Sequence, residues 1–478
     1  MRYRARWICS LFFVYTMLVL NARSQNTGTF WHISDHHLDP YYTENGQTPM
    51  EVCPSSYGRQ TDAGPLGDYV CDSPWKLINS SAYAMKKIEP NPDFIIWTGD
   101  DSLHTADQDK YLGVDKVIEI VGNITALLRE VFPDTKFYPA LGNHDYHPKS
   151  QIPPGGSAML TAFANIWQDW LTADAYESFK REGYYKENLD PNGKHVLIAL
   201  NSNFWYDSNK VVDGTGDPGG EFAWLEESLK SASQNSQKVF IIGHVPPGYF
   251  ELAANSPKRW FYPEYNKRFI SIIQTYADVI SGQFFGHHHS DTFKIFKDGS
   301  GNTIASMLLT PAVTPWRTTL PGVNKGSNNP AIRLFEYNKD TLFLKDFQQY
   351  YLNLEEANTE TSADEDSWKL EYRATESYNI PDVSTTSWGT LAKKMRDKCE
   401  ADSSDCPKEF TLYQLHNSAS YNTDPCNETC QRFQLCAITE QDIEQYELCQ
   451  EKWGSAGFNP VVSVYALAIG ILFYFLIV

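Results

Sequence analysis

The chain has 478 residues, of which 42% are hydrophobic, and its 59 Asp and Glu residues outnumber its 40 Lys and Arg residues. This length and composition suit one large catalytic domain with a smaller appendage. The formal net charge of −19 argues against binding to a nucleic-acid polymer, because such binding needs a basic face. A phosphate-containing small molecule stays open as a substrate, because a bound metal can reverse the local field.

The first 24 residues are typical of a secretory signal peptide. Three arginines precede the apolar segment 7–20, and the small residues Ala22 and Ser24 lie just before a predicted cleavage site at Gln25. A membrane anchor is the alternative, but the apolar segment is short for a span. We predict that residues 1–24 are removed.

Residues 25–355 are predicted to form the catalytic domain, in which short apolar segments end in polar turns that contain glycine. Such segments are typical of buried strands. They occur in TGTFWHISDHH, DFIIWTGDD, KFYPALGNHD, KVFIIGHVP and GQFFGHHH. Helical periodicity lies between them, over 82–88, 111–131, 158–170, 221–231 and 264–281. Strands that alternate with helices predict an α/β protein with its functional residues at strand ends.

The composition changes near the end of this domain. Residues 331–354 predict a hairpin that turns at 338–340. Residues 355–382 then hold nine Asp and Glu residues against only two cations, and we expect a solvated acidic connector. The connector and a Cys-rich helical domain together occupy residues 356–453.

Eight cysteines remain after removal of the signal peptide, which carries Cys9. An even number in a secreted chain suggests four disulfides. Pairing between sequence neighbours would join 53 with 71, 399 with 406, 426 with 430 and 436 with 449, but spacing alone does not fix the connectivity. A zinc knuckle is the alternative for the last four. The eight are Cys53, Cys71, Cys399, Cys406, Cys426, Cys430, Cys436 and Cys449.

Two further features fit the secretory pathway. N-glycosylation sequons occur at Asn79, Asn123 and Asn427. Small residues around Ser455 precede an apolar segment, 461–478, which lacks the cationic flank of an ordinary membrane span. We therefore predict a GPI-attachment signal over 454–478 with Ser455 as the anchored residue, and a tail anchor is the alternative. The mature protein is expected on the extracellular face of the cell membrane, with a secreted form also open.

Five blocks of Asp, Asn and His residues follow the predicted strands in order: DHH, GDD, GNHD, GH and GHHH. These residue types supply the oxygen and nitrogen ligands that zinc-class metals accept. The glycines let the backbone turn sharply near a metal. In extended backbone alternate side chains point the same way, so we expect Asp35 to act with His37. By the same rule His287 acts with His289, and the histidines between them face elsewhere.

The order D-x-H, GD, GNH[DE], GH and GHxH is similar to that of the calcineurin-like metallophosphoesterase superfamily. WTGDDSLH, WHISDHHLDPYY and the spacing of the last four cysteines resemble the acid sphingomyelinase branch. Asp35 follows the predicted signal peptide too closely for the saposin-type domain of acid sphingomyelinase itself. The chain is therefore identified as a member of the acid sphingomyelinase-like phosphodiesterases, and the predicted GPI signal favours their membrane-anchored branch over the soluble one.

This resemblance implies a four-layer α/β/β/α sandwich with a small helical, disulfide-rich C-terminal domain. It also implies a phosphoric diester hydrolase with two zinc ions per chain. One zinc would bind Asp35, His37, Asp100 and His289. The other would bind Asp100, Asn143, His244 and His287, so that the carboxylate of Asp100 bridges the two. Iron-containing purple acid phosphatases have a tyrosine three residues after the bridging aspartate, where this chain has Leu103, and this difference favours zinc.

The remaining polar residues of the blocks receive expected roles beside the metals. His144 and His104 are expected to lie near the leaving group and to protonate it. For His104 the alternative is a supporting or solvent-exposed histidine. Asp145 is expected to orient His144, and Asp101 to be a solvated neighbour. The implied reaction is attack on phosphorus by a metal-activated water.

The physiological substrate is left open by the sequence. Nucleotide-like diesters and pyrophosphates are as compatible with it as lipid headgroups, because no saposin-type domain is expected to extract a lipid. Five aromatic residues could form a rim for a base or a choline group, although core packing is the favoured interpretation. They are Trp205, Tyr206, Trp260, Phe261 and Tyr262.

Two other functions compete with a phosphodiesterase. One is a phosphomonoesterase or nucleotidase on the same core, because the core ligands do not separate these activities. The other is a GPI-anchored regulatory binding protein with little catalysis. The resemblance further implies a link to membrane lipid composition and to restraint of innate immune signalling, and we expect a monomer.

Overall fold

The computed structural model describes residues 26–453 apart from 254–255, 322, 324–326, 361–363 and 422–425. The predicted signal peptide, the predicted GPI signal and Ser455 lie outside the described residues. None of the helices in the described part of the chain combines the length and the apolar character that a membrane span needs.

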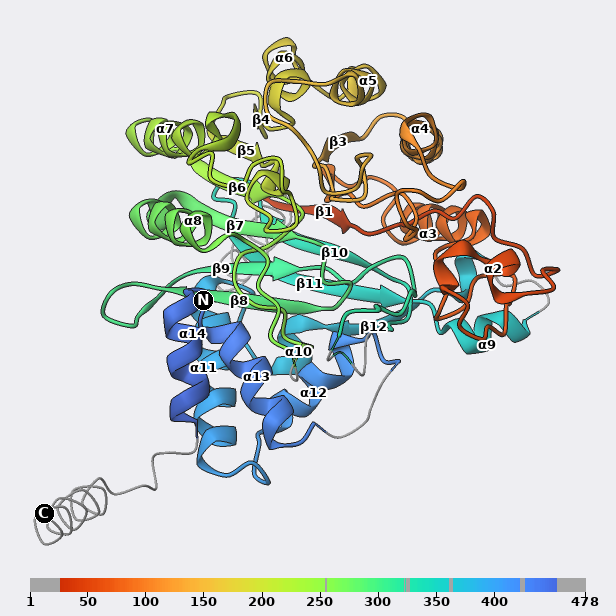
Figure 1. Cartoon of the computed structure of the whole chain (residues 1–478). Coiled ribbons are helices and arrows are strands. Elements are labelled where there is room, and N and C mark those ends of the chain that lie inside the picture. Colours follow the sequence, from red (N-terminus) through yellow and green to blue (C-terminus); the bar gives the residue numbers. More distant parts are fainter. Residues whose placement is uncertain are drawn as a thin grey trace, which may run out of the picture.

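Two six-stranded sheets form the centre of the molecule (Figure 1). The first has the order β12–β11–β10–β1–β2–β3, and the second has the order β4–β5–β6–β7–β9–β8. The strands of the first sheet are β1 (Thr27–Ile33), β2 (Phe94–Trp97), β3 (Lys136–Pro139), β10 (Ala331–Asn338), β11 (Leu344–Tyr351) and β12 (Lys369–Arg373). Those of the second are β4 (Tyr185–Asn188), β5 (His195–Ala199), β6 (Lys238–Ile242), β7 (Ile280–Phe285), β8 (Thr292–Lys297) and β9 (Thr303–Leu309).

The five strands that precede the polar blocks are parallel neighbours. β1 pairs in parallel with β2, and β2 with β3, in the first sheet. β6 pairs in parallel with β7 in the second sheet. All four residues of β2 are buried, as expected of a parallel strand that is covered on both faces. The carboxyl ends of these strands therefore carry the polar blocks to the same edge of each sheet.

Aromatic side chains fill the space between the two sheets. Phe30 of β1 stacks on Phe94 and Phe335 of its own sheet, with ring centroids 4.8 and 4.9 Å away. The same ring meets Phe284 of β7 edge-on at 5.4 Å. Burial of each such side chain contributes roughly 2–3 kcal/mol, so this layer fixes one sheet against the other.

Helices cover the outer faces of both sheets (Figure 1). Trp167 of α5 packs against Trp97 of β2 with ring centroids 5.7 Å apart, and α7 and α8 contact the second sheet. This is the predicted four-layer α/β/β/α arrangement. The helices that precede β9 are α2 (Pro49–Val52), α3 (Trp75–Ile88), α4 (Val114–Val131), α5 (Ala158–Trp167), α6 (Ala173–Glu182), α7 (Glu221–Gln234) and α8 (Pro263–Tyr276).

Two C-terminal helices, α11 (Thr385–Ala401) and α13 (Glu428–Thr439), blue in Figure 1, pack against β8 and β9 of the second sheet. Trp388 of α11 is buried and lies 4.5 Å from Phe293 of β8, between ring centroids. The other C-terminal helices are α9 (Leu354–Thr359), α10 (Ala374–Tyr378), α12 (Lys408–Asn417) and α14 (Ile443–Lys452). The structure pairs the eight cysteines as sequence neighbours, so the zinc-knuckle alternative is wrong.

The structure departs from the sequence predictions at several elements. The acidic segment is not simply a solvated connector, because β12 within it pairs with β11. The helix expected over 82–88 begins at Trp75, and the one expected over 264–281 ends at Tyr276. The polar helix α6 was not predicted, and neither were the strands β4, β5, β8 and β9, which are not followed by a polar block. The domain boundaries themselves stay a prediction.

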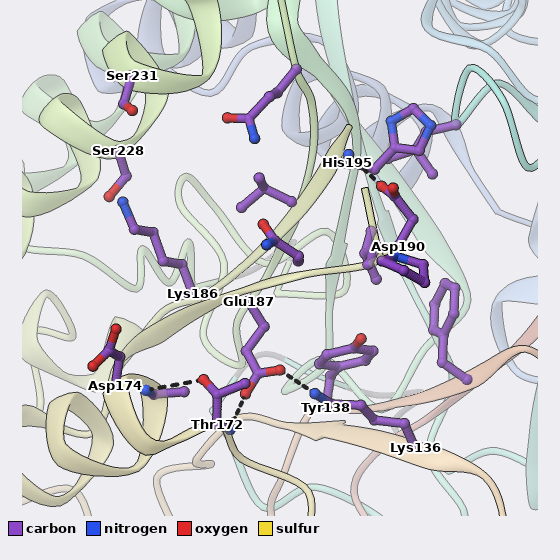
Figure 2. A pocket seen from close by; sticks show the side chains of 18 of the residues that line it. Lys136, Tyr138, Thr172, Asp174, Lys186, Glu187, Asp190, His195, Ser228 and Ser231 are labelled. Carbon is purple, nitrogen blue, oxygen red and sulfur yellow. Dashed lines mark hydrogen bonds and ion pairs between the residues drawn. The ribbon is translucent and has the colours of Figure 1, made fainter. Parts of the chain in front are cut away.

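A cleft of about 1160 Å³ lies away from the polar blocks, where β3 and β4 form the edges of the two sheets (Figure 2). Glu187 of β4 forms an ion pair with Lys136 of β3 and accepts a hydrogen bond from the Thr172 backbone N–H at 2.6 Å. The cleft is lined by both acidic and basic side chains. The Lys136–Glu187 ion pair joins the two sheet edges there.

Candidate metal centre

The polar blocks converge into two compact groups of metal-ligand type. Potential ligand atoms of Asp35, His37 and His289 lie within 4.8 Å of one another, and so do those of Asp100, His244 and His287. Each group contains three of the four residues assigned to one zinc. A third group of three side chains with the same spacing consists of His37, His104 and His144.

The backbone around these ligands is tightly turned, which corrects the expectation of extended conformation. Asp35, His37, His287 and His289 all have positive φ angles, between 42° and 71°. Their backbone is held by long-range hydrogen bonds, such as Asp35 N–H to the Gly99 carbonyl at 2.8 Å. The members of each pair still point to the same site, but they do so because of these turns and not because of strand alternation.

The histidines between these pairs face away from the metal groups, as expected. His36 lies 3.1 Å from the carboxylate of Asp101 through Nδ1. His288 lies 2.7 Å from Glu251 through Nδ1, and its Nε2 accepts the indole N–H of Trp260 at 2.7 Å. His288 therefore holds the Trp260 indole in place and does more than separate two ligands.

Hydrogen bonds fix which nitrogen of two histidines is available to a metal. Nδ1 of His37 lies 2.7 Å from the Ser102 carbonyl, and Nδ1 of His244 lies 2.7 Å from the Thr98 carbonyl. A carbonyl can only accept, so Nδ1 carries a proton and Nε2 is the nitrogen that can bind a metal. This arrangement is typical of metal-binding histidines, whose second nitrogen donates to the protein.

Several polar atoms at the centre lack a partner, which fits a bound cation. Nε2 of His287 and Oδ1 of Asn143 are buried without a hydrogen bond in the described part of the chain. Nε2 of His37 and Nε2 of His289 lie 3.2 Å apart. Two lone pairs at that distance repel each other unless a proton or a metal lies beside them. The residues present therefore fit a metal centre.

Buried carboxylates at the centre raise the pKa of two histidines. Burial alone would lower the pKa of His37, but the hydrogen-bonding carboxylate of Asp35 and the charge of Asp100 raise it to about 9. The pKa of His244 is likewise lowered by burial but raised overall to about 9 by Asp100. In the metal-free protein these histidines hold protons, which a metal must displace.

Two glycines permit the close approach of the blocks. A Cβ atom at Gly142 would lie 2.1 Å from Oδ1 and 2.2 Å from the backbone nitrogen of Asp100. A Cβ atom at Gly286 would lie 2.1 Å from Oγ of Ser34 and 2.7 Å from Oδ2 of Asp35. These glycines are needed for space and not only for turning.

His104 has a defined environment beside the metal groups. Its Nδ1 lies 2.8 Å from Oδ1 of Asp72, and its backbone N–H donates to Oδ2 of Asp72 at 2.6 Å. Its ring stacks on Trp316 with centroids 3.6 Å apart and planes 9° apart. Sequence reasoning missed Asp72 and Trp316, because neither belongs to a polar block. The nearest signal was the position of Asp72 directly after Cys71.

Two of the expected supporting roles are wrong. The Asp145 carboxylate accepts backbone N–H groups of Asp100, Asp101 and Gly142, and so orders two loops instead of orienting the His144 ring. Nδ1 of His144 is buried without a partner among the described residues. Asp101 is not solvated, since it is 1% exposed and accepts the indole N–H of Trp97 at 3.1 Å. The ring of His144 lies 4.4 Å from that of His104, between centroids.

A pocket of about 400 Å³ opens over the histidines. Of the five aromatic residues considered for a rim, Tyr206 and Trp260 line it, and their rings pack against His287 at 5.3 and 4.3 Å between centroids. Trp205 and Phe261 are fully buried core residues. Lys149 and Trp316 also line the pocket and could not be located there from sequence.

The predicted glycosylation sites lie on helices. Asn123 on α4 and Asn427 at the start of α13 are exposed, and Asn79 on α3 is half-buried. The Asn427 side chain accepts the Cys430 N–H at 3.0 Å and so caps α13. Glycosylation at these positions stays a prediction.

Comparisons with known proteins agree with this geometry. Residues 28–291 match the family model "Calcineurin-like phosphoesterase", and residues 302–454 match "Acid sphingomyelin phosphodiesterase C-terminal region". The human "Acid sphingomyelinase-like phosphodiesterase 3b" is 46% identical over 93% of this chain and 94% of that protein. The human "Cyclic GMP-AMP phosphodiesterase SMPDL3A" is 40% identical over 88% of this chain and 90% of that protein.

The chain belongs to the acid sphingomyelinase-like phosphodiesterases. As a member of this family it is a phosphoric diester hydrolase with a metallophosphoesterase core. The candidate His and Asp groups imply a divalent metal at the carboxyl ends of β1, β2, β6 and β7.

Proposed function

We propose that the chain is a dinuclear zinc phosphodiesterase that acts on phosphodiester or pyrophosphate bonds of nucleotide-like or lipid-headgroup-like substrates. The observation that carries this proposal is the presence of two adjacent ligand groups, one around Asp35 and one around His244, with Asp100 close to both. Oδ2 of Asp100 lies 3.6 Å from Nε2 of His37 and 3.0 Å from Nε2 of His244. Nitrogen and carboxylate donors of this kind suit zinc.

The chain's own residues supply the rest of the chemistry. Bound zinc would neutralise phosphate charge and activate water. His104 and His144 lie beside the metal groups, where a ring nitrogen can hold a proton for the departing oxygen. Tyr206 and Trp260 offer aromatic surfaces to a base or a choline group, and Lys149 offers a positive charge to a second phosphate.

The decisive experiment uses secreted protein truncated before Gly454. Hydrolysis of bis-p-nitrophenyl phosphate and of p-nitrophenyl phosphate is measured from pH 4 to 8, with zinc content determined on the same sample. We expect diester cleavage and two zinc ions per chain. Preference for the monoester would favour the phosphomonoesterase alternative. Two zinc ions without turnover of either compound would favour a regulatory binding protein.

The membrane location is a separate part of the proposal. The apolar C-terminal segment and the predicted signal peptide support a GPI-anchored protein on the outer face of the cell membrane. From there the enzyme would reach lipid headgroups, and through them it would modulate membrane composition and innate immune signalling. Phosphatidylinositol-specific phospholipase C should release the protein from intact cells. Retention after this treatment would favour a tail anchor.

A further inference from the structure

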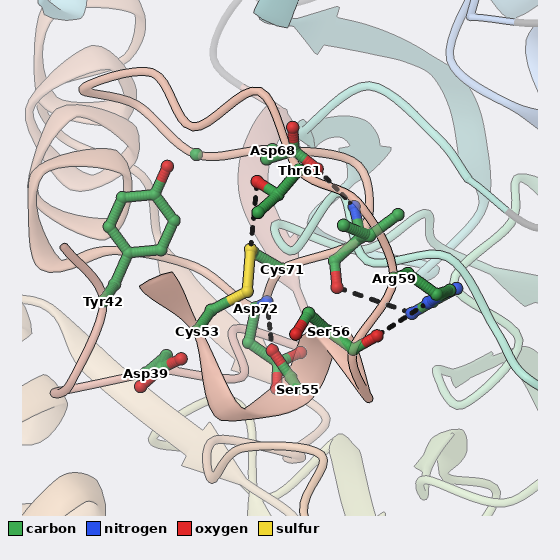
Figure 3. The surroundings of a disulfide bond; sticks show 12 residues. Asp39, Tyr42, Cys53, Ser55, Ser56, Arg59, Thr61, Asp68, Cys71 and Asp72 are labelled. Carbon is green, nitrogen blue, oxygen red and sulfur yellow. Dashed lines mark hydrogen bonds between the residues drawn. A yellow bond between two sulfur atoms is a disulfide. The ribbon is translucent and has the colours of Figure 1, made fainter. Parts of the chain in front are cut away.

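A loop is closed by the Cys53–Cys71 disulfide (Figure 3). The next residue, Asp72, contacts His104. Both cysteines are fully buried, and with Val52 they form a small apolar cluster of their own. The loop therefore has a fixed core, although it contains little regular structure. Asp72 follows this disulfide directly and is itself fully buried.

Asp72 connects the loop to His104 through both of its carboxylate oxygens. Oδ1 lies 2.8 Å from Nδ1 of His104, and Oδ2 accepts the His104 backbone N–H at 2.6 Å. The backbone N–H of Asp72 donates to Oγ of Ser55 at 2.8 Å (Figure 3). Since a carboxylate can only accept, this geometry places the Nδ1 proton of His104 toward Asp72.

Trp316 fixes the same imidazole from a second direction. Its indole N–H donates to the Ser55 carbonyl at 2.9 Å, so the loop also positions this ring. The indole lies flat on the His104 ring. Nε2 of His104 makes no hydrogen bond to any described residue, and His104 lines the pocket. The loop thus holds one nitrogen and one ring face, and it leaves the other nitrogen for the substrate.

We propose that the disulfide-closed loop 53–71 and the adjoining Asp72 position His104. Asp72 fixes the imidazole tautomer, and Trp316, which Ser55 of the loop holds, fixes the plane of the ring. Asp72 and Trp316 act through His104 and not on the substrate. A carboxylate behind a working imidazole sets its tautomer and orientation. This inference rests on the proposed role of His104 as a proton donor.

The test replaces Asp72 by Asn, because the amide NH2 group then takes the place of one accepting oxygen and faces either the ring N–H or the backbone N–H of His104. Two diesters are compared, bis-p-nitrophenyl phosphate and diphenyl phosphate, because the more basic phenolate depends more on protonation. We expect kcat for diphenyl phosphate to fall on the order of 100-fold, with a smaller loss for the nitrophenyl ester and little change in KM. The matched control is Asp62→Asn, an exposed residue of the same loop.

A double variant separates positioning from general support. If Asp72 acts through His104, then Asp72→Asn combined with His104→Ala loses no more activity than His104→Ala alone. Multiplied losses, or equal losses on the two diesters, would overturn the inference. Full activity of His104→Ala would instead overturn the proposed role of His104 itself.

A second variant keeps the test open if Asp72→Asn does not fold. Trp316→Phe retains a stacking ring but removes the hydrogen bond to Ser55. We expect a smaller loss of kcat with the same dependence on the leaving group. Activity equal to that of the Asp62→Asn control on both diesters would contradict the positioning role of the loop.

Discussion

Asn143 illustrates the cost of a metal centre at the scale of one residue. Its Oδ1 atom is buried without a hydrogen-bond partner among the described residues, as is Nε2 of His287. Each unsatisfied buried group costs about 1–3 kcal/mol. Metal binding would offset that cost, since the same atoms become ligands.

Removal of one such atom should therefore affect the metal more than the fold. We expect Asn143→Ala or His287→Ala to lose zinc and to lower kcat on the order of 100-fold or more. Zinc content and diester hydrolysis measure the effect, and circular dichroism measures the fold. Asn91→Ala, at an exposed position, is the control. Full activity in either ligand variant would remove the two-zinc assignment.

Glu251 makes the molecule sensitive to acid. Burial alone would raise the pKa of its carboxyl group, but His288, Lys294 and Ser290 beside it lower the pKa to about 2. Because this value lies below the ordinary pKa of about 4.5, the carboxylate stabilises the folded state at neutral pH. The stabilisation, up to about 3 kcal/mol, is lost as the pH falls from about 4.5 to about 2.

Glu251→Gln should therefore reduce the free energy of unfolding at pH 7. It should also make that free energy less dependent on pH below about 4.5. Urea unfolding at several pH values between 3 and 7 measures both effects. Glu264→Gln, at an exposed position on α8, should leave the pH dependence of the free energy of unfolding unchanged. If Glu251→Gln also leaves this pH dependence unchanged, the low pKa of Glu251 is contradicted.

At the scale of elements, the site depends on close contact between loops that follow adjacent strands. Gly142 lies directly against the backbone of Asp100. Gly122 lies on α4, where a Cβ atom would meet only Cδ1 of Ile166 within 4 Å, at 3.9 Å. Replacement by alanine should therefore disrupt the site at Gly142 but stabilise the protein at Gly122.

Gly142→Ala should separate the loops and abolish metal binding, because no conformation of the new methyl group avoids the Asp100 backbone. Gly122→Ala should raise the free energy of unfolding by about 1 kcal/mol, since alanine favours a helix interior. Thermal unfolding and zinc content distinguish the two variants. Normal zinc content in Gly142→Ala would show that the loops can move apart.

The elements also show what the sequence could and could not predict. Strands β1, β2, β3, β6 and β7 were predictable because each is a short apolar segment followed by a polar block. That order places the blocks at strand ends, and so most of the candidate ligands could be named. Asp72 and Trp316 were not predictable, because a disulfide loop and a distant turn bring them to His104. Asp145 was assigned to the wrong partner, because adjacency in sequence does not show where a carboxylate points.

At the scale of the whole molecule, the metal centre joins the two sheets. Asp35 and Asp100 follow strands of the first sheet, whereas His244 and His287 follow strands of the second. A metal bound to both sets stabilises the sandwich as a whole and not only one loop. Ligands that bind the folded state alone raise its stability by about 4 kcal/mol at a thousandfold excess over the dissociation constant.

Chelation should therefore lower the melting temperature as well as abolish activity. We expect a decrease of several degrees after zinc removal and full recovery when zinc is restored. Scanning calorimetry of the two samples measures the difference. Identical melting temperatures would mean that metal binding does not stabilise the packing of the two sheets.

The position of β1 has a consequence for the order of events during synthesis. β1 is a central strand, with β2 on one side and β10 on the other, and Phe30 pairs with Phe94 and faces Phe335. While the ribosome is still translating the region before β10, one edge of β1 has no partner. An unpaired apolar edge can join the wrong strand, so the nascent chain needs protection from such pairing until residue 338 has emerged. The first strand to be made is thus among the last to be completed.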